Sequence, residues 1–142
     1  MMERTARQKR LATIRWLWIV PSALLVWFGM LAFGNVLYTL AIGLCPADQL
    51  LSGFCTADWF RPVERGIVVG CAGLTGFAIV LVTALIAPDF RLRATAVMFG
   101  AGALVATSMA LQTGALPEFV TALLGGVLGM LIAARLPQSI EL

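Results

Sequence analysis

The sequence predicts an all-α integral membrane protein, a bundle of four transmembrane helices with both termini in the cytoplasm. Four long segments are almost free of charge, and a helix needs about 20 apolar residues to cross the hydrocarbon core of a bilayer. Hydrophobic residues make up 61% of the 142-residue chain and charged residues only 12%, against roughly 25% charged residues in soluble domains. We predict spans at residues 17–44, 66–87, 94–112 and 117–134.

These spans lie within a predicted transmembrane domain of residues 16–134, between a basic arm (1–15) and a tail (135–142). With four spans, the arm, the second loop and the tail share one side of the membrane. Eight of the ten basic residues are on that side: Arg4, Arg7, Lys9, Arg10, Arg15, Arg91, Arg93 and Arg135. The positive-inside rule therefore predicts a multi-pass protein of the bacterial inner membrane with cytoplasmic termini.

The formal net charge of +3 follows membrane topology and does not indicate a nucleic-acid partner. The basic arm either attracts anionic lipid, at about 1 kcal/mol per basic residue near the surface, or docks a cytoplasmic partner. Lipid attraction accounts for the arm fully and is the interpretation we favour. Membrane lipids are the first predicted partner.

The first helix is expected to begin before Trp16 and to run to about Gly43. Trp16 and Trp18 follow Arg15, and indole rings favour the headgroup region. The apolar stretch is longer than the core of a signal peptide, which has about 7–15 residues. We therefore predict a retained span.

The first loop, residues 45–65, is expected to face outward and to carry structure of its own. Cys45 and Cys55 lie in this loop, in a compartment that permits disulfides. We favour a disulfide over two unlinked cysteines. We also expect Trp59 and Phe60 to rest on the outer membrane–water interface.

The later helices have clear boundary signals. Pro88 ends the second helix, and the short loop at residues 88–93 makes the second and third helices antiparallel neighbours. Gly114 marks the exit from the third helix. Pro117 opens the fourth, with Glu118 in the first turn, where its charge complements the helix dipole.

Small residues recur at spacings of four along the later helices, which places them on one helix face. Such faces let helices approach closely in lipid, where little hydrophobic drive joins them. We predict packing or interface roles for Gly66, Gly70, Gly73, Gly76, Gly100, Gly125, Gly129 and Ala133. They either pack the helices of one chain or serve another subunit, which would make the protein a homo-oligomer or part of a larger membrane complex.

The spans contain no Asp, Glu, Lys or Arg at mid-membrane depth, and the chain contains no His. Ion-coupled transporters usually carry such groups inside the membrane. The candidates for a polar lining are uncharged: Asn35, Thr107, Ser108 and Gln112.

No catalytic, cofactor-binding or metal-ligating set is recognisable, so we predict a protein that is not an enzyme and needs no cofactor. Its expected role is that of a non-catalytic accessory or structural subunit. One alternative is a small oligomeric transporter or channel using the polar lining. A second is a lipid-headgroup enzyme using the charged residues of the outer loop, Asp48, Asp58, Arg61, Glu64 and Arg65.

Overall fold

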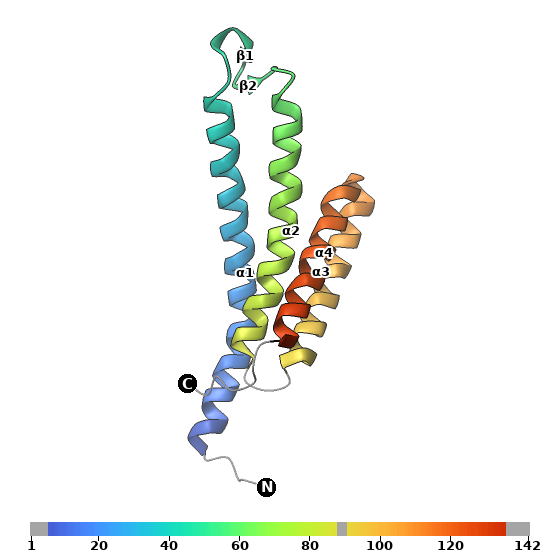
Figure 1. The fold of residues 1–142 in the computed structure, drawn as a ribbon. Helices are drawn as coiled ribbons and strands as arrows, with labels where there is room; N and C mark the ends of the chain where they lie inside the picture. The colour runs from blue at the N-terminus through green and yellow to red at the C-terminus, as the bar shows by residue number, and fades with distance from the viewer. Residues whose placement is uncertain (1–5, 88–90, 136–142) are drawn as a thin grey trace.

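The computed structural model describes residues 6–87 and 91–135, and it confirms the all-α class with four long apolar helices. These are α1 (Ala6–Gly43), α2 (Phe60–Ile86), α3 (Arg91–Thr113) and α4 (Leu116–Arg135). Each is long and apolar enough to cross a membrane. The first turn of α1 and the last turn of α4 lie at the same end of the molecule, as an even number of spans requires (Figure 1).

All four helices begin before the predicted spans, α1 and α2 by the most. α1 begins at Ala6, so most of the predicted basic arm is helical. α2 begins at Phe60, earlier than residue 66. Its first turns bear exposed Arg61 and Arg65 and therefore belong outside the hydrocarbon core.

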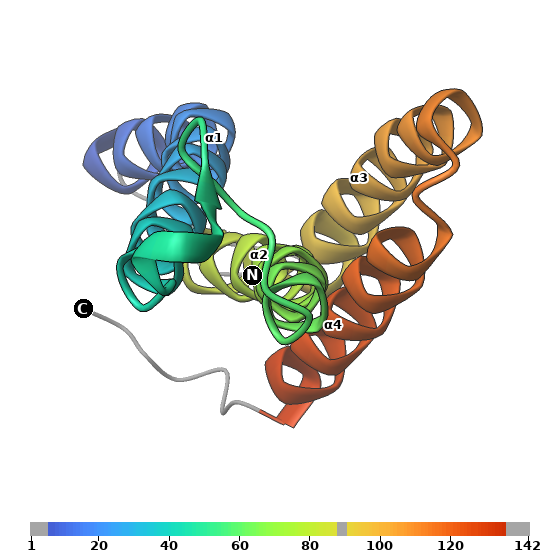
Figure 2. The ribbon, with the colours of Figure 1, turned by 90° about the horizontal axis from the view of Figure 1, so that it is seen from above.

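The four helices form a row rather than a closed square. α2 occupies the middle, with α1 against one side and the α3–α4 pair against the other (Figure 2). Among the described elements, α1 packs extensively only on α2. Because α1 is much longer than α4, the α1–α2 hairpin reaches further at its loop end than α3 and α4 do (Figure 1).

A small folded loop joins α1 to α2. It contains a 3₁₀ turn, η1 (Ala47–Gln49), and two short antiparallel strands, β1 (Leu50–Leu51) and β2 (Phe54–Cys55). Ser52 and Gly53 between the strands have φ of 50° and 85°. Positive φ at both central residues is the requirement of the type I′ hairpin turn, and glycine meets it without strain.

Two clusters of buried apolar residues lie at opposite ends of the molecule along the helix axes. The loop-end cluster contains Ala41, Cys55, Ala57 and Phe60. The other, which we call the inner cluster, contains Ile19, Ala87 and Ala94, so it joins α1, the end of α2 and the start of α3.

The expectation that Phe60 rests on the membrane–water interface is wrong. Its side chain is only 3% exposed, and its ring meets the ring of Tyr38 edge-on at a centroid distance of 5.7 Å. Phe60 is the first residue of α2 and faces α1, so it joins the core. Trp59, one residue earlier, is 40% exposed.

Candidate functional site

The closest helix contact lies between α2 and α4, which run parallel to each other and meet through glycines. A methyl group added at Gly76 would overlap the carbonyl oxygen of Ala122, and one added at Gly125 would overlap that of Gly73. A methyl group at Gly129 would lie 3.0 Å from the Phe77 carbonyl oxygen. Only glycine lets the two backbones approach this closely.

The same contact continues toward the inner end of the pair. Ala133 of α4 is 2% exposed, and Val80 and Ala84 of α2 are 2% and 0% exposed. The Thr121 hydroxyl lies 3.1 Å from the Val69 carbonyl oxygen of α2 and 3.0 Å from that of Pro117 in its own helix. Four of the predicted interface glycines, Gly73, Gly76, Gly125 and Gly129, thus lie together inside one chain, with Ala133.

The other three predicted interface glycines lie elsewhere. Gly66 and Gly70 are on the loop-side half of α2, and Gly100 is on α3. A methyl group at any of these three would meet nothing within 4 Å. The small-residue pattern therefore divides into a group that packs α2 on α4 and a group that no other described helix of this chain covers.

The predicted polar lining does not converge within one chain. Asn35 is on α1 and the other three residues are on α3, which lies across α2 from it (Figure 2). Asn35 donates to the Leu31 carbonyl oxygen at 3.1 Å, Thr107 to that of Ala103 at 2.7 Å and Ser108 to that of Val105 at 2.8 Å. Each bond stays within its own helix, and all four side chains, Gln112 included, are exposed.

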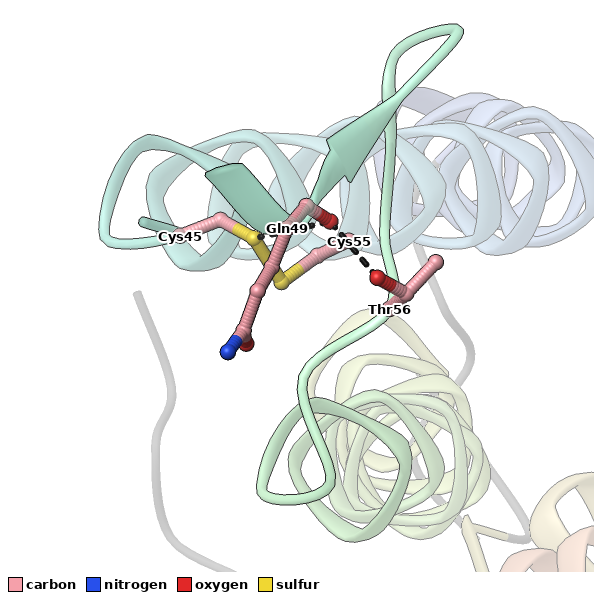
Figure 3. Close-up of a disulfide and its surroundings, with 4 residues drawn as sticks. All are labelled: Cys45, Gln49, Cys55 and Thr56. Carbon is pink, nitrogen blue, oxygen red and sulfur yellow. Dashed lines mark hydrogen bonds between the residues drawn. A yellow bond between two sulfur atoms is a disulfide. The ribbon is translucent and has the colours of Figure 1, made fainter. Parts of the chain in front are cut away.

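The outer loop is closed by the predicted disulfide between Cys45 and Cys55, whose Cα atoms are 5.9 Å apart (Figure 3). The Thr56 hydroxyl and backbone N–H both donate to the Gln49 carbonyl oxygen, at 2.8 and 2.9 Å. The bridge and these bonds tie the hairpin to the end of α1. Cys71 is free, and its sulfur faces Gly34 of α1.

The charged residues of the loop do not form an enclosed site. Asp48, Asp58, Arg61 and Arg65 are exposed, and Glu64 is half-buried. Within residues 6–87 and 91–135, no group of three or more His, Cys, Asp or Glu side chains could hold a metal ion. The arrangement in this loop is that of a solvated surface.

Sequence reasoning missed a contact at the inner end of the molecule. Arg15 of α1 donates from Nε to the Ile86 carbonyl oxygen at 3.0 Å, and from its terminal nitrogen to that of Leu85 at 3.2 Å. Carbonyls in the last turn of a helix lack partners within that helix, and a cation there also favours the dipole. The sequence could have indicated this contact, because the predicted topology places Arg15 and the end of the second helix at the same depth in the membrane.

Two open grooves lie at this inner end. One, of about 290 Å³, runs between α1 and α3 and is lined by Trp16, Ile19, Val20, Arg93, Ala94, Val97 and Met98. We call it the α1–α3 groove. The other, of about 470 Å³, lies between α3 and α4 and is lined only by apolar residues: Leu92, Ala96, Phe99, Val127, Met130, Leu131 and Ala134. We call it the α3–α4 groove.

No protein-family model, curated protein or solved structure matches the chain.

Proposed function

We propose that the protein is a non-catalytic subunit of a membrane assembly and that the outer face of α3 is its association surface. The observation that carries this proposal is the row of helices. Because α2 is occupied by helices on opposite sides, association through its centre is closed, and α3 at the edge of the row offers a long uncovered face.

The exposed face of α3 has the composition of a helix interface in lipid. Gly100, one turn before Leu104 on this face, has open space around it. Thr107 and Ser108 lie further along the same face, and Leu104, between Gly100 and these hydroxyls, is 74% exposed. Small residues allow close approach, and hydroxyls can bond across helices. The partner is a second copy of this chain or a transmembrane helix of another subunit.

Crosslinking in native membranes tests this proposal. In a Cys71→Ala background the remaining cysteines are joined to each other, so a single Leu104→Cys reports on the α3 face. We expect an oxidised covalent dimer, or a discrete larger adduct, with this variant.

The matched pair for this test is Gly100→Leu against Gly29→Leu on α1, since both glycines have open space in the monomer. Gly100→Leu should abolish the crosslink and Gly29→Leu should preserve it. A protein that stays monomeric in native mass spectrometry and gives no adduct at Leu104→Cys would contradict the proposal.

A liposome flux assay addresses the transporter alternative. The dispersed polar residues and their bonds within single helices do not favour a pathway through one chain. Flux of an ion or small solute that Thr107→Val abolishes would replace the subunit proposal with an oligomeric channel.

We propose further that the protein lies in the bacterial inner membrane with the Arg15 end in the cytoplasm. The concentration of basic residues at that end supports this orientation. Reporter fusions at the C-terminus and within the Ser52–Gly53 turn test it, and a cytoplasmic signal from the turn fusion would reverse it.

A further inference from the structure

Asn35 of α1 has hydrogen-bonding capacity that the described chain does not use. The other short polar side chains of this span, Ser22 and Thr39, each donate their single O–H to a carbonyl oxygen of α1, at 2.9 and 2.8 Å. An asparagine amide offers two N–H groups and a carbonyl oxygen. Asn35 donates one N–H to the Leu31 carbonyl oxygen, and its own Oδ1 accepts no hydrogen bond from residues 6–87 or 91–135. Its side chain is exposed.

Asn35 lies at a depth where the bilayer offers no polar partner. Its neighbour Gly34 faces the Cys71 sulfur of α2. Cys71 is six residues inward of Arg65, the last charged residue before the α2 span, which at 1.5 Å per residue is about 9 Å along the helix axis. An amide group without a partner is unfavourable in hydrocarbon, and membrane helices satisfy such groups by bonding to polar side chains of other helices.

The face of α1 that bears Asn35 is turned away from the described helices. α1 is at the edge of the row, packs extensively only on α2, and meets α2 through Gly34 and Tyr38. Asn35 is about 100° around the helix from Gly34. Its face continues toward the inner end with Phe28 and Leu31, which are 59% and 48% exposed. We call Phe28, Leu31 and Asn35 the Asn35 face.

A second copy of this chain matches the amide. Two amides are complementary to each other, because each can donate to the carbonyl oxygen of the other. Copies in one membrane share their orientation, so a two-fold axis along the membrane normal places the same residue of each copy at the same depth. Residues 16–44 contain no Asp, Glu, Lys or Arg, so no charge repels the two helices. A different protein would need a polar group of its own at this depth.

We propose that the Asn35 face is an interface between two parallel copies of the chain, in which the two Asn35 amides bond to each other. Leu24, Phe28, Leu31 and Asn35 follow one another at spacings of four, three and four, the repeat that suits a left-handed pair of helices. A single asparagine in such a seam fixes the register of the pair. This interface is at the α1 edge of the row, across α2 from α3 (Figure 2), and does not depend on association through the α3 face.

Disulfide crosslinking at two phenylalanines tests the geometry. Phe28 and Phe33 are both on α1 and are 59% and 47% exposed, but they lie about 20° and 160° around the helix from Asn35. In a Cys71→Ala background the remaining cysteines are joined to each other. On oxidation in native membranes, Phe28→Cys should then form a covalent dimer with twice the mass of the chain. Phe33→Cys, the matched control, should stay monomeric.

Changes at Asn35 test the amide. The purified Phe28→Cys protein is diluted with increasing amounts of phospholipid in vesicles before oxidation, and the lipid-to-protein ratio at half-maximal dimer is measured. Asn35→Leu should lower that ratio about tenfold, the effect of one or two hydrogen bonds between membrane helices. Asn35→Gln, which keeps an amide, should recover most of the dimer. Gln112→Leu, which removes an exposed amide from α3, is the control and should leave the ratio unchanged.

The proposal is overturned if Phe28→Cys stays monomeric, if Phe33→Cys crosslinks equally, or if mass spectrometry finds a different protein in the adduct. It is also overturned if Asn35→Leu leaves the ratio unchanged or if Asn35→Gln is as weak as Asn35→Leu. The Leu104→Cys crosslink reports on the α3 face separately, so the two interfaces can fail independently. Retention of the Cys45–Cys55 disulfide and an unchanged helical circular dichroism spectrum show that each variant is folded.

Discussion

α2 contacts a helix on each of two opposite faces, and the two contacts are built differently. Toward α4, the contact is between backbones, with glycines of both helices lying against carbonyl groups of the other. Toward α1, it is between side chains, such as the rings of Tyr38 and Phe60, and it is closed at its two ends by a disulfide and by Arg15. The α4 contact therefore depends on shape at a few positions, whereas the α1 contact depends on ties at its ends.

This difference predicts how each contact fails. A glycine contact has no side chain that can move aside, so one added group separates the helices along their length. A contact tied at its ends loses local order when one tie is removed, while the rest of the helix pair stays packed.

The largest effect is expected from Gly76→Val. The added side chain overlaps the Ala122 backbone, and overpacking of this kind costs about 1–3 kcal/mol or more. We expect α2 and α4 to separate, which should appear as a large fall in the thermal unfolding midpoint in mild detergent. Gly70→Val, on the same helix but with open space around it, is the control, and an equal fall in both variants would contradict the backbone contact.

Removal of the disulfide by Cys45→Ser with Cys55→Ser should destabilise the loop end by about 2–3 kcal/mol, because a closed loop of this length restricts the unfolded chain. Hydrogen exchange should rise in the hairpin and the adjoining turns of α1 and α2, and remain unchanged at the α2–α4 glycines. Cys71→Ser, which removes the free thiol, should leave the hairpin protected. Increased hydrogen exchange throughout the molecule would contradict the prediction that the disulfide stabilises only the loop end.

Arg15→Gln should have a smaller effect of the same kind at the other end. It weakens the bonds to the Leu85 and Ile86 carbonyl oxygens. It also removes a cation from the end of the helix dipole, at about 0.5–1 kcal/mol. Exchange should increase in the last turn of α2 only. Arg135→Gln at the end of α4 is the comparison, and equal exchange in α2 for the two variants would refute the cap.

The smallest effect is expected from Thr121→Val, which removes the hydroxyl facing the Val69 carbonyl oxygen. Hydrogen bonds between membrane helices contribute about 0.6 kcal/mol on average. Thr107→Val, whose hydroxyl bonds only within α3, should change the unfolding midpoint by less. If the two variants behave alike, the α2–α4 contact is one of shape alone.

Much of the fold could be predicted because it depends on local composition. The charge-free segments predict the four helices, and Pro88, Gly114 and Pro117 mark boundaries close to those observed. The disulfide could be predicted from two cysteines in one short loop. In each case the decisive residues are neighbours in the sequence.

The candidate surfaces could be predicted only in part. Spacing identified the glycines, yet it did not distinguish Gly76, which lies against Ala122, from Gly70, which meets nothing within 4 Å. Both glycines are on the same helix in similar sequence surroundings. The two glycines differ because α4 begins beside α2 at a level that includes Gly76 and leaves out Gly70. No residue near either glycine indicates that level.

The sequence by itself determined that the helices suit a lipid bilayer, how many helices there are and approximately where they end. These properties follow from the hydrophobicity and backbone preferences of contiguous residues. Only the tertiary structure decided that α2 stands in the middle of a row, that Phe60 is core, that Arg15 caps α2 and that Trp16 shares a groove with Arg93. Each of these depends on the distance between backbones far apart in the chain, which is set by how the helices pack and not by any one segment.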